Sequence, residues 1–294
     1  MTIQEALDDF LVEQQIRGNT SKTVQYYSFS VGFYVRFAGS VTPVHEITLE
    51  SLRAYYMHLA GRNITSTTIQ TYIRALRSFL TWCYQQEYIP ANLPEKFRLP
   101  KAQRKAIDVL TDSEVRRLLS SFNLRYLVHL RNYCMCSLML DSGLRLHEVV
   151  TLTLEHIHLP EGYIIVDGKG NKQRIVPLGL FTRKVLFRYL SRRPGCAQTD
   201  RAFLMSNLLP VTDATLRQMF RKLKQRSGIP RLRAHLLRHT FATRYLENGG
   251  DMYALQQILG HTSLEMVKRY VHSTTRKTVP RFPEFSPLDN LLRA

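Results

Sequence analysis

The sequence predicts a mainly α-helical protein of two domains, a small all-helical domain followed by a mainly helical domain that carries a small antiparallel sheet. Three observations support this fold class. Apolar residues recur at helical spacing over most of the 294 residues. Three prolines, followed by the run KAQRK, interrupt this pattern at residues 90–105. Beyond this break, the runs YIIV at 163–166 and QRIV at 173–176 are typical of short strands.

Residues 1–98 are expected to form the first domain, with four helices. The first helix follows a capping-box pattern made by Thr2 and Glu5, and its apolar residues include Ile3, Leu7 and Phe10. Thr48 and Ser66 are expected to cap the third and fourth helices. The expected later helices span residues 21–37, 49–59 and 67–86.

The break predicts a linker at residues 99–106 and a second domain at residues 107–294. The second domain begins with another capping-box pattern, Thr111 with Glu114. The sequence DGKGNK joins the two β-type runs and indicates a hairpin. Gly260 is expected to end a helix, and the pair Thr262 and Glu265 to begin the next one. Helices are expected at residues 112–121, 124–140, 146–154, 181–191, 212–227, 235–247, 252–259 and 286–293.

The charge of the chain is unevenly distributed. Lysine and arginine number 41 against 23 acidic residues, a net charge of +18, of which residues 1–98 carry +1 and residues 99–294 carry +17. This bias indicates a polyanionic partner, nucleic acid before a membrane surface. No apolar run of about 18 residues predicts a membrane span. The N-terminus does not have the pattern of a signal peptide, so a cytoplasmic, nucleoid-associated protein is expected.

The cysteines do not form a metal-binding or disulfide pattern. There is no CxxC pair, and two of the cysteines stand two residues apart on an expected helix and therefore face different sides. We expect buried free thiols at all four positions, which are Cys83, Cys134, Cys136 and Cys196.

The sequence HLLRH at residues 235–239 places His235 and His239 on one face of an expected helix. This spacing occurs in zinc proteases, but there a glutamate follows the first histidine, and here that position is Leu236. Arg238 also lies between the histidines, where its charge would oppose a metal ion. An arginine beside a histidine fits a phosphate better, because guanidinium binds phosphate oxygens in bidentate fashion.

Other residues of suitable chemistry follow and precede HLLRH. His261 occurs in the sequence LGH, and Tyr270 follows nine residues later in KRYVH. Upstream, Arg145 in DSGLRLHEV is followed at helical spacing by Glu148, whose carboxylate could hold the guanidinium in one orientation. Lys169 lies between two glycines in the hairpin sequence DGKGNK. Each of these residues alone is weak evidence for a site, since a loop lysine, a surface ion pair or a packed tyrosine is common.

Together, the ordered set Arg145, Lys169, His235, Arg238, His261 and Tyr270 resembles the tyrosine recombinase (phage integrase) family. The family pattern is Arg, Lys, His-x-x-Arg, His or Trp, and then Tyr. The resemblance extends to GLRLHE, GKGNKQRIVPL and HLLRHTFATRYLENGGDMYALQQILGH, and it covers residues 105–275 closely. The first domain resembles the family's core-binding domain in architecture only. The length indicates a short, Xer-like member.

The resemblance implies a site-specific DNA recombinase that cuts and rejoins strands through a 3′-phosphotyrosine intermediate. Arg145 and Arg238 would clamp the scissile phosphate, and Tyr270 would attack phosphorus. Lys169 would protonate the leaving 5′ oxygen, His235 would act as the base toward the tyrosine, and His261 would donate a hydrogen bond to the phosphate. His239 is expected to pack behind the site. No cofactor or metal is implied.

The resemblance also implies a DNA partner with specific recombination sites and a tetramer on paired sites, with possible accessory proteins. A C-terminal helix at 286–293 would dock in its own domain or insert into a neighbouring subunit. Further DNA contacts are expected from Arg53, Arg62, Arg74, Arg77, Lys172 and Arg174. Two other functions remain open, a type IB topoisomerase that acts without paired sites and a non-catalytic DNA-binding regulator. The second would be expected to lack part of the catalytic set.

Overall fold

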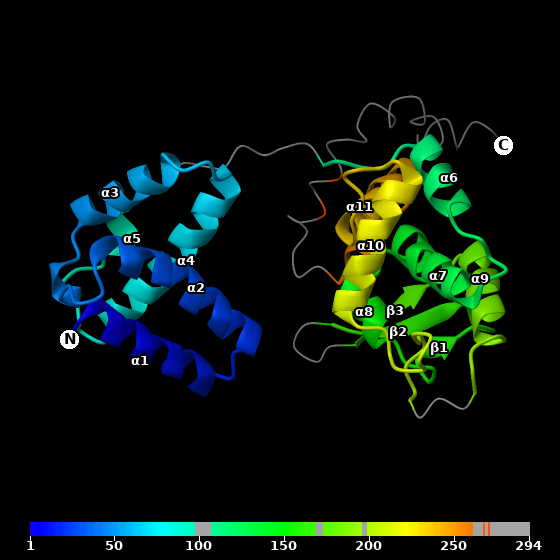
Figure 1. Ribbon diagram of the computed structural model, residues 1–294, viewed down its shortest axis with the longest axis horizontal. Coiled ribbons are helices and arrows are strands. Elements are labelled where there is room, and N and C mark those ends of the chain that lie inside the picture. The colour runs from blue at the N-terminus through cyan, green and yellow to red at the C-terminus, as the bar shows by residue number, and fades with distance from the viewer. Residues whose placement is uncertain (98–106, 169–172, 196–198, 261–266, 268–269, 271–294) are drawn as a thin grey trace, which may run out of the picture. The chain divides into compact units, whose positions relative to one another are not determined.

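The computed structural model describes residues 1–97, 107–168, 173–195, 199–260, 267 and 270 (Figure 1). The chain divides into two compact units, Met1–Lys105 and Ala106–Ala294, each with its own hydrophobic core. The expected linker at 99–106 and the expected tail helix at 286–293 lie outside the described residues. Separate cores are what two independently folding domains require.

Unit 1 is a cluster of helices around an aromatic core. Helix α2 packs against α1 and α4, and α3 and α5 pack against α4. The rings of Phe10 and Phe79 meet edge to face, with centroids 5.6 Å apart, and Tyr34 meets Tyr55 in the same way at 5.1 Å. The elements are α1 (Ile3–Ile16), α2 (Ser21–Ala38), the 3-10 turn η1 (Val44–Glu46), α3 (Leu49–Ala60), α4 (Ser66–Gln85) and α5 (Leu93–Lys96).

Two local predictions in unit 1 need correction. The N-cap of α4 is Thr65, whose hydroxyl accepts a hydrogen bond from the Thr68 N–H at 3.2 Å, so Ser66 is the first helical residue. The proline-rich stretch begins with the short helix α5, since Pro94 stands in the first turn, where its missing N–H costs nothing. Leu93 and Phe97 are buried in the core, so this short helix, which the sequence did not predict, belongs to the first domain within its expected bounds of 1–98.

Unit 2 combines helices with a three-stranded antiparallel sheet in the order β1-β2-β3. Ile165 of β2 lies opposite Ile175 of β3, as the hairpin predicts. Strand β1 was not predicted, because a strand of two residues leaves no alternation to detect. The strands are β1 (Ile157–His158), β2 (Tyr163–Asp167) and β3 (Gln173–Pro177), and the helices are α6 (Asp112–Ser120), α7 (Leu127–Asp141), α8 (Leu146–Thr151), α9 (Leu180–Leu190), α10 (Asp213–Ser227), α11 (Ala234–Glu247) and α12 (Met252–Leu259).

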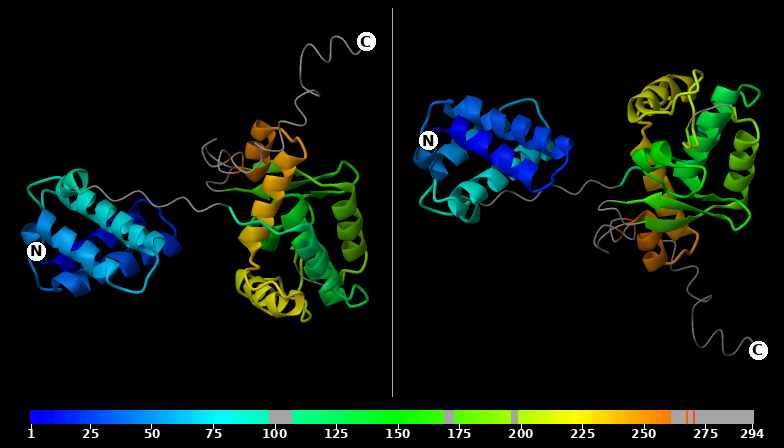
Figure 2. Two further views of the ribbon diagram at one scale, coloured as in Figure 1. Left: turned by 90° about the horizontal axis from the view of Figure 1, so that it is seen from above. Right: turned by 90° about the horizontal axis from the view of Figure 1, so that it is seen from below.

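Helix α7 is the centre of unit 2, with α9 and α11 packed against it (Figures 1 and 2). Apolar side chains all round the helix, including Leu130, Leu138 and Met139, are fully buried, as expected of a helix inside a core. Cys134 and Cys136 are buried free thiols on this helix, and burial raises the pKa of Cys136 to about 12. The prediction for the cysteines is confirmed at these positions and at Cys83, while Cys196 lies outside the described residues.

The start of unit 2 is fastened to the helix that carries HLLRH. The Leu110 N–H donates to the Thr240 hydroxyl at 2.9 Å, and Arg244 donates to the Leu110 carbonyl at 3.0 Å. Arg231, just ahead of α11, donates to Asp108 and Glu114. The hydrogen bond from Arg231 lowers the pKa of Glu114 to about 2. These bonds hold α11, the helix that carries the candidate site residues, to the start of unit 2.

Among the described helices of both units, none is both long enough and apolar enough to cross a lipid bilayer.

Candidate active site

Glu148 is the buried carboxylate around which the site is built. It stands in the first turn of α8, and both of its oxygens accept hydrogen bonds from Arg145, the residue that precedes the helix. The Arg145 backbone N–H donates to Oε2 at 2.8 Å, and Nη1 of the guanidinium donates to Oε1 at 2.7 Å. The spacing in GLRLHE predicted this pairing, and the structure confirms it. Glu148 is 5% exposed, whereas the side chain of Arg145 is 35% exposed and accessible to a ligand.

Arg174 of β3 forms a second ion pair with the same carboxylate. Its two terminal nitrogens, Nη1 and Nη2, each donate to one oxygen of Glu148 at 2.9 Å. Burial alone would raise the pKa of Glu148, but the hydrogen bonds and charge of Arg174, together with the bonds from Arg145, lower it below its ordinary value. Arg174 was expected to contact DNA. Its side chain is instead 12% exposed and points to acceptors inside the protein.

The C-terminal end of α12 supplies the remaining acceptors. Its last carbonyl groups have no partner within the helix and lie at the negative end of the helix dipole. Arg174 Nε donates to the Ile258 carbonyl at 2.7 Å, and Arg145 Nη2 donates to the Gly260 carbonyl at 3.3 Å. Gly260 ends the helix in the left-handed conformation, with φ of +61°, as the sequence predicts. One helix end therefore holds guanidinium groups from two distant elements.

Arg238 of α11 is held at the same helix end. It donates from Nη1 to the Gly143 carbonyl at 2.6 Å and from Nη2 to the Leu259 carbonyl at 2.7 Å, and it is 4% exposed. Burial and the nearby charge of Arg145 lower the pKa of Arg238 to about 10, so the group stays protonated at neutral pH. Gly143 has φ of +66°, and a Cβ there would come within 2.4 Å of the Phe241 ring.

Tyr270 is paired with His239. A hydrogen bond of 2.7 Å joins the tyrosine Oη to His239 Nδ1, and the tyrosine is 4% exposed. The expectation that His239 only packs behind the site was therefore wrong. The i, i+4 spacing of HLLRH was the available signal, because it places His239 on the face of α11 that carries His235. The two histidine rings have centroids 6.5 Å apart.

His235, the expected base, stands in the first turn of α11, where the residue is accessible to solvent although its ring is partly covered. Partial burial of the ring, with the positive charges of Arg238, Arg233 and Arg145, lowers the pKa of His235. The imidazole is therefore neutral at pH 7 and able to accept a proton. The structure thus brings together Arg145, Glu148, His235, Arg238 and Tyr270, since the charges of Arg145 and Arg238 act on His235 and Tyr270 lies near Arg238. The expected residues Lys169, Lys172 and His261 lie outside the described residues.

A basic groove that the sequence did not predict adjoins His235. It has a volume of about 270 Å³, and its cationic lining comes mainly from α10. Arg217, Arg221 and Lys224 stand on one face of that helix, at spacings of four and three residues, and Arg233 contributes from the start of α11. The helical spacing of basic residues in TLRQMFRKLKQRS was the signal that could have identified this groove.

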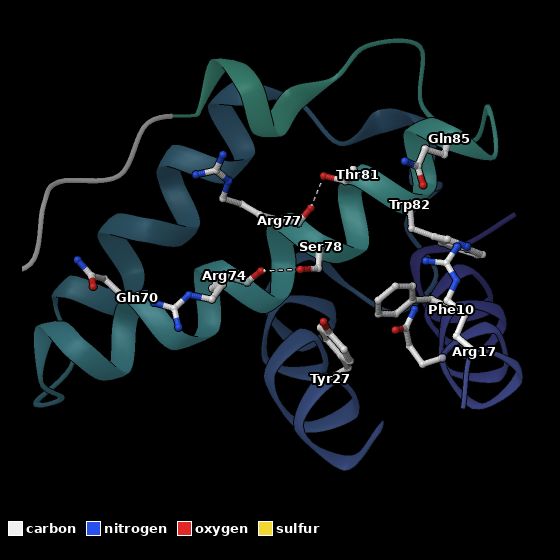
Figure 3. A pocket seen from close by; sticks show the side chains of 11 residues that line it. Phe10, Arg17, Tyr27, Gln70, Arg74, Arg77, Ser78, Thr81, Trp82 and Gln85 are labelled. Atoms are coloured by element: carbon white, nitrogen blue, oxygen red, sulfur yellow. Dashed lines mark hydrogen bonds between the residues drawn. The ribbon is translucent and has the colours of Figure 1, made fainter. Parts of the chain in front are cut away.

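Unit 1 carries a larger polar groove of about 670 Å³ (Figure 3). Arg74 and Arg77 of α4 line it, together with Arg17, the C-cap residue after α1, which the sequence did not single out. The other two arginines expected to bind DNA do not line this groove: Arg62 lies over the Phe33 ring at 5.8 Å, and Arg53 is exposed on α3. The structure therefore brings together two of the four arginines expected to contact DNA in unit 1.

A metal centre is not supported by the part of the chain that the structure describes. No three side chains from histidine, cysteine, aspartate and glutamate cluster there. His239 of HLLRH faces a tyrosine.

Comparisons with known proteins give matches over nearly the whole chain. The phage integrase family matches residues 108–277, and the phage integrase N-terminal SAM-like domain matches residues 7–90. The tyrosine recombinase XerD of Halalkalibacterium halodurans is 31% identical to this chain over 97% of the chain and 99% of its own length. The tyrosine recombinase XerC of Bacillus pumilus is 29% identical, over 95% and 96% respectively.

Solved structures give the same result. XerA recombinase is 28% identical, covers 96% of this chain and 99% of its own, and has a TM-score of 0.54. The Tn1549 transposon integrase, at 21% identity, shares the fold with a TM-score of 0.75 over 92% of this chain and 95% of its own. The catalytic family match alone spans more than half of the chain and contains Arg145, Arg238 and Tyr270. The chain therefore belongs to the phage integrase family and is a tyrosine recombinase of the Xer type.

Proposed function

We propose that this protein cuts and rejoins DNA at specific sites by transferring a DNA phosphate to and from Tyr270. The observation that carries the proposal is the convergence of Arg145 and Arg238 on one helix end, close to a buried tyrosine hydroxyl. Fixed guanidinium donors stabilise the extra negative charge of a pentacoordinate phosphorus, and they need no reorganisation during the reaction. Solved structures of the Tn1549 transposon integrase and of a lambda integrase dimer are complexes with DNA.

In the proposed first step, Tyr270 Oη attacks phosphorus, and the bond from phosphorus to the 5′ oxygen breaks. The products are a 3′-phosphotyrosine and a free 5′ hydroxyl, and the reverse reaction with a new 5′ hydroxyl rejoins the strand. Lys169 would protonate the leaving 5′ oxygen, and His261 would donate a hydrogen bond to a phosphate oxygen; both roles come from the family pattern. The energy of the original ester is kept in the phosphotyrosine, so no cofactor is required.

The proton of Tyr270 needs an acceptor, and the family pattern assigns this role to His235. The hydrogen bond of 2.7 Å favours His239 as the direct acceptor in the arrangement described. We assign His239 to receive the proton and His235, neutral at pH 7, to contact the phosphate or relay the proton. To separate these roles, each histidine is replaced by alanine in turn, and the rate at which Tyr270 forms the covalent adduct with DNA is measured.

DNA would be held by basic surfaces on both units. In unit 2, the groove lined by Arg217, Arg221 and Lys224 adjoins His235 and is suited to phosphates beside the cleavage point. In unit 1, Arg74 and Arg77 would contact the duplex through the groove on α4. Arg53 and Arg62 remain proposed contacts on other surfaces. Such binding weakens steeply as the salt concentration rises.

Recombination requires two sites held together, and the family pattern suggests a tetramer tied by the C-terminal helix at 286–293. A protein acting on chromosomal DNA would work in the cytoplasm, at the nucleoid. Deletion of residues 286–294 should then abolish recombination while DNA binding is retained. Equal loss of both activities would indicate simple destabilisation.

The deciding experiment is a search for a covalent protein–DNA adduct that survives SDS. Labelled fragments that flank the native gene, with nicked versions to trap cleavage, are incubated with the wild type and with Tyr270→Phe. An adduct with the wild type alone supports the proposal and locates the cleaved phosphate. An adduct with both proteins means that another residue attacks. Tight binding without any adduct favours a DNA-binding regulator. Cleavage accompanied by relaxation of supercoiled DNA in the absence of paired sites favours a type IB topoisomerase.

A further inference from the structure

Arg174 occupies a position in the site that its sequence context does not explain. It comes from β3, whereas Arg145 belongs to α8 and Arg238 to α11. Its Nε donates to the Ile258 carbonyl, and its two terminal nitrogens donate to the two oxygens of Glu148. Three of its five N–H groups donate to acceptors within the protein and the side chain is only 12% exposed, so the guanidinium faces inward rather than toward a DNA backbone.

The charge of Glu148 creates a difficulty for a phosphate-binding site. Its carboxylate lies 2.7 Å from Arg145 and 4.0 Å from Arg238, the two residues proposed to clamp the phosphate. An unopposed carboxylate at these distances would repel the phosphate and cancel part of the attraction from the arginines. The bidentate pair with Arg174 places one further positive charge on this carboxylate.

We propose that Arg174 is a positioning residue for the phosphate clamp, one that cancels the charge of Glu148 and fixes the carboxylate that holds Arg145. This inference rests on the proposed function, because it takes Arg145 and Arg238 as the phosphate-binding pair. It replaces the expectation that Arg174 binds DNA. The cluster then presents two net positive charges to the phosphate: three guanidinium groups share one carboxylate.

Two other roles for Arg174 make different predictions. A DNA contact would contribute to affinity and to its salt dependence, whatever the charge of the scissile phosphate. If the ion pair is merely structural, its loss would impair folding and would therefore slow the cleavage of every substrate by the same factor. A positioning role through charge affects the cleavage of a negatively charged phosphate most, and the effect depends on the presence of the Glu148 carboxylate.

The test compares Arg174→Gln, Glu148→Gln and the double variant with the wild type. Arg183→Gln serves as the matched control, because Arg183 also donates to a backbone carbonyl, that of Pro160, at a point away from Glu148. Duplexes carry the cleavage point located with the wild type, with either the natural phosphate or an uncharged methylphosphonate at that position. The single-turnover rate of covalent adduct formation, the DNA affinity and the thermal midpoint are measured for each protein.

We expect Arg174→Gln to slow cleavage of the natural phosphate by about 10- to 100-fold, by analogy with the loss of a residue that orients a metal ligand. On the methylphosphonate the defect should shrink to about threefold or less, because its transition state carries one negative charge less and is repelled less by the uncompensated Glu148. The double variant should cleave the natural phosphate faster than Arg174→Gln, since the uncompensated carboxylate is gone. Arg183→Gln should match the wild type.

Equal slowing on both substrates, with no recovery in the double variant, would overturn the inference and leave a structural ion pair. Reduced DNA affinity with a smaller salt dependence and an unchanged cleavage rate at saturation would overturn it in favour of a DNA contact. Both results presuppose an adduct with the wild type. If the wild type forms none on any fragment, the proposed function itself fails, so the two failures are distinguishable.

Discussion

The arginines around Glu148 and the arginines along α4 carry the same charge but are held in opposite ways. Arg238 is 4% exposed and donates to two backbone carbonyls, whereas Arg74 is exposed on the rim of a groove. Burial of a guanidinium costs desolvation energy, which the fold offsets with fixed acceptors. An exposed guanidinium avoids this cost, and its side chain remains free to change rotamer.

The difference corresponds to two tasks. A site that stabilises a transition state gains when its donors are fixed in advance, because no reorganisation is then needed. A surface that follows a DNA backbone gains when its cations can adjust to phosphates of varying position. Three experiments can break or sharpen this comparison.

The largest effect is expected from Arg238→Lys, which keeps the charge but loses the two bonds to the Gly143 and Leu259 carbonyls. If fixed geometry matters more than charge, adduct formation should slow by about 10²- to 10³-fold while DNA affinity changes little. Single-turnover cleavage and a binding titration measure the two quantities. Arg188→Lys on the exposed surface of α9 is the control. A cleavage rate within about threefold of the wild type would break the comparison, because charge alone would then suffice.

A smaller effect is expected from the double variant Arg74→Ala and Arg77→Ala. DNA affinity should fall by about tenfold at low salt, and the slope of log Kd against log salt should decrease by about 1–2, since up to two phosphate contacts are lost. The cleavage rate at saturating DNA should remain close to that of the wild type. Arg53→Ala plus Arg62→Ala, outside the groove, tests the other expected contacts. Unchanged affinity in the first pair would remove α4 from the DNA-binding surface.

The smallest effect concerns an ion pair that serves neither task, that of Arg231 with Glu114. The pKa of Glu114 is lowered to about 2 in the folded state, so its stabilising contribution is complete above the unfolded pKa and is lost as the pH falls from about 4.5 toward 2. Arg231→Gln should therefore lower the Tm by about 1–3 °C at pH 7 and by less at pH 3. Thermal unfolding at both values measures the difference. A Tm difference that does not shrink at low pH would rule out the ion pair as its source.

The residues that were predictable from the sequence are those fixed by local spacing. Arg145 and Glu148 meet because they stand three residues apart at the start of a helix, and Thr2 and Thr111 cap helices through the same rule. The hairpin of β2 and β3 also follows from local alternation. The ordered set of site residues was recognisable because each member lies in a short motif with its own spacing.

The features that were not predictable depend on distant partners. The inward orientation of Arg174 depends on α12, since its Nε partner Ile258 stands 84 residues away. His239 meets Tyr270, which is 31 residues further along the chain. The i, i+4 spacing of HLLRH places His239 beside His235, but no local pattern identifies Tyr270 or Ile258 as the distant partner. The short elements β1 and α5 were missed because two to four residues give too little periodicity to detect.

The end of α12 has a consequence for how this protein tolerates mutation. The acceptors that hold the three arginines are main-chain carbonyls, so the hydrogen bonds do not depend on which side chains stand at positions 258 and 259. Both side chains are buried, Ile258 at 9% and Leu259 at 0% exposure, and selection there acts on volume and apolarity. Gly260 differs, because its left-handed backbone penalises any side chain. Positions 258 and 259 can therefore change among aliphatic residues during evolution, whereas position 260 is restricted to glycine.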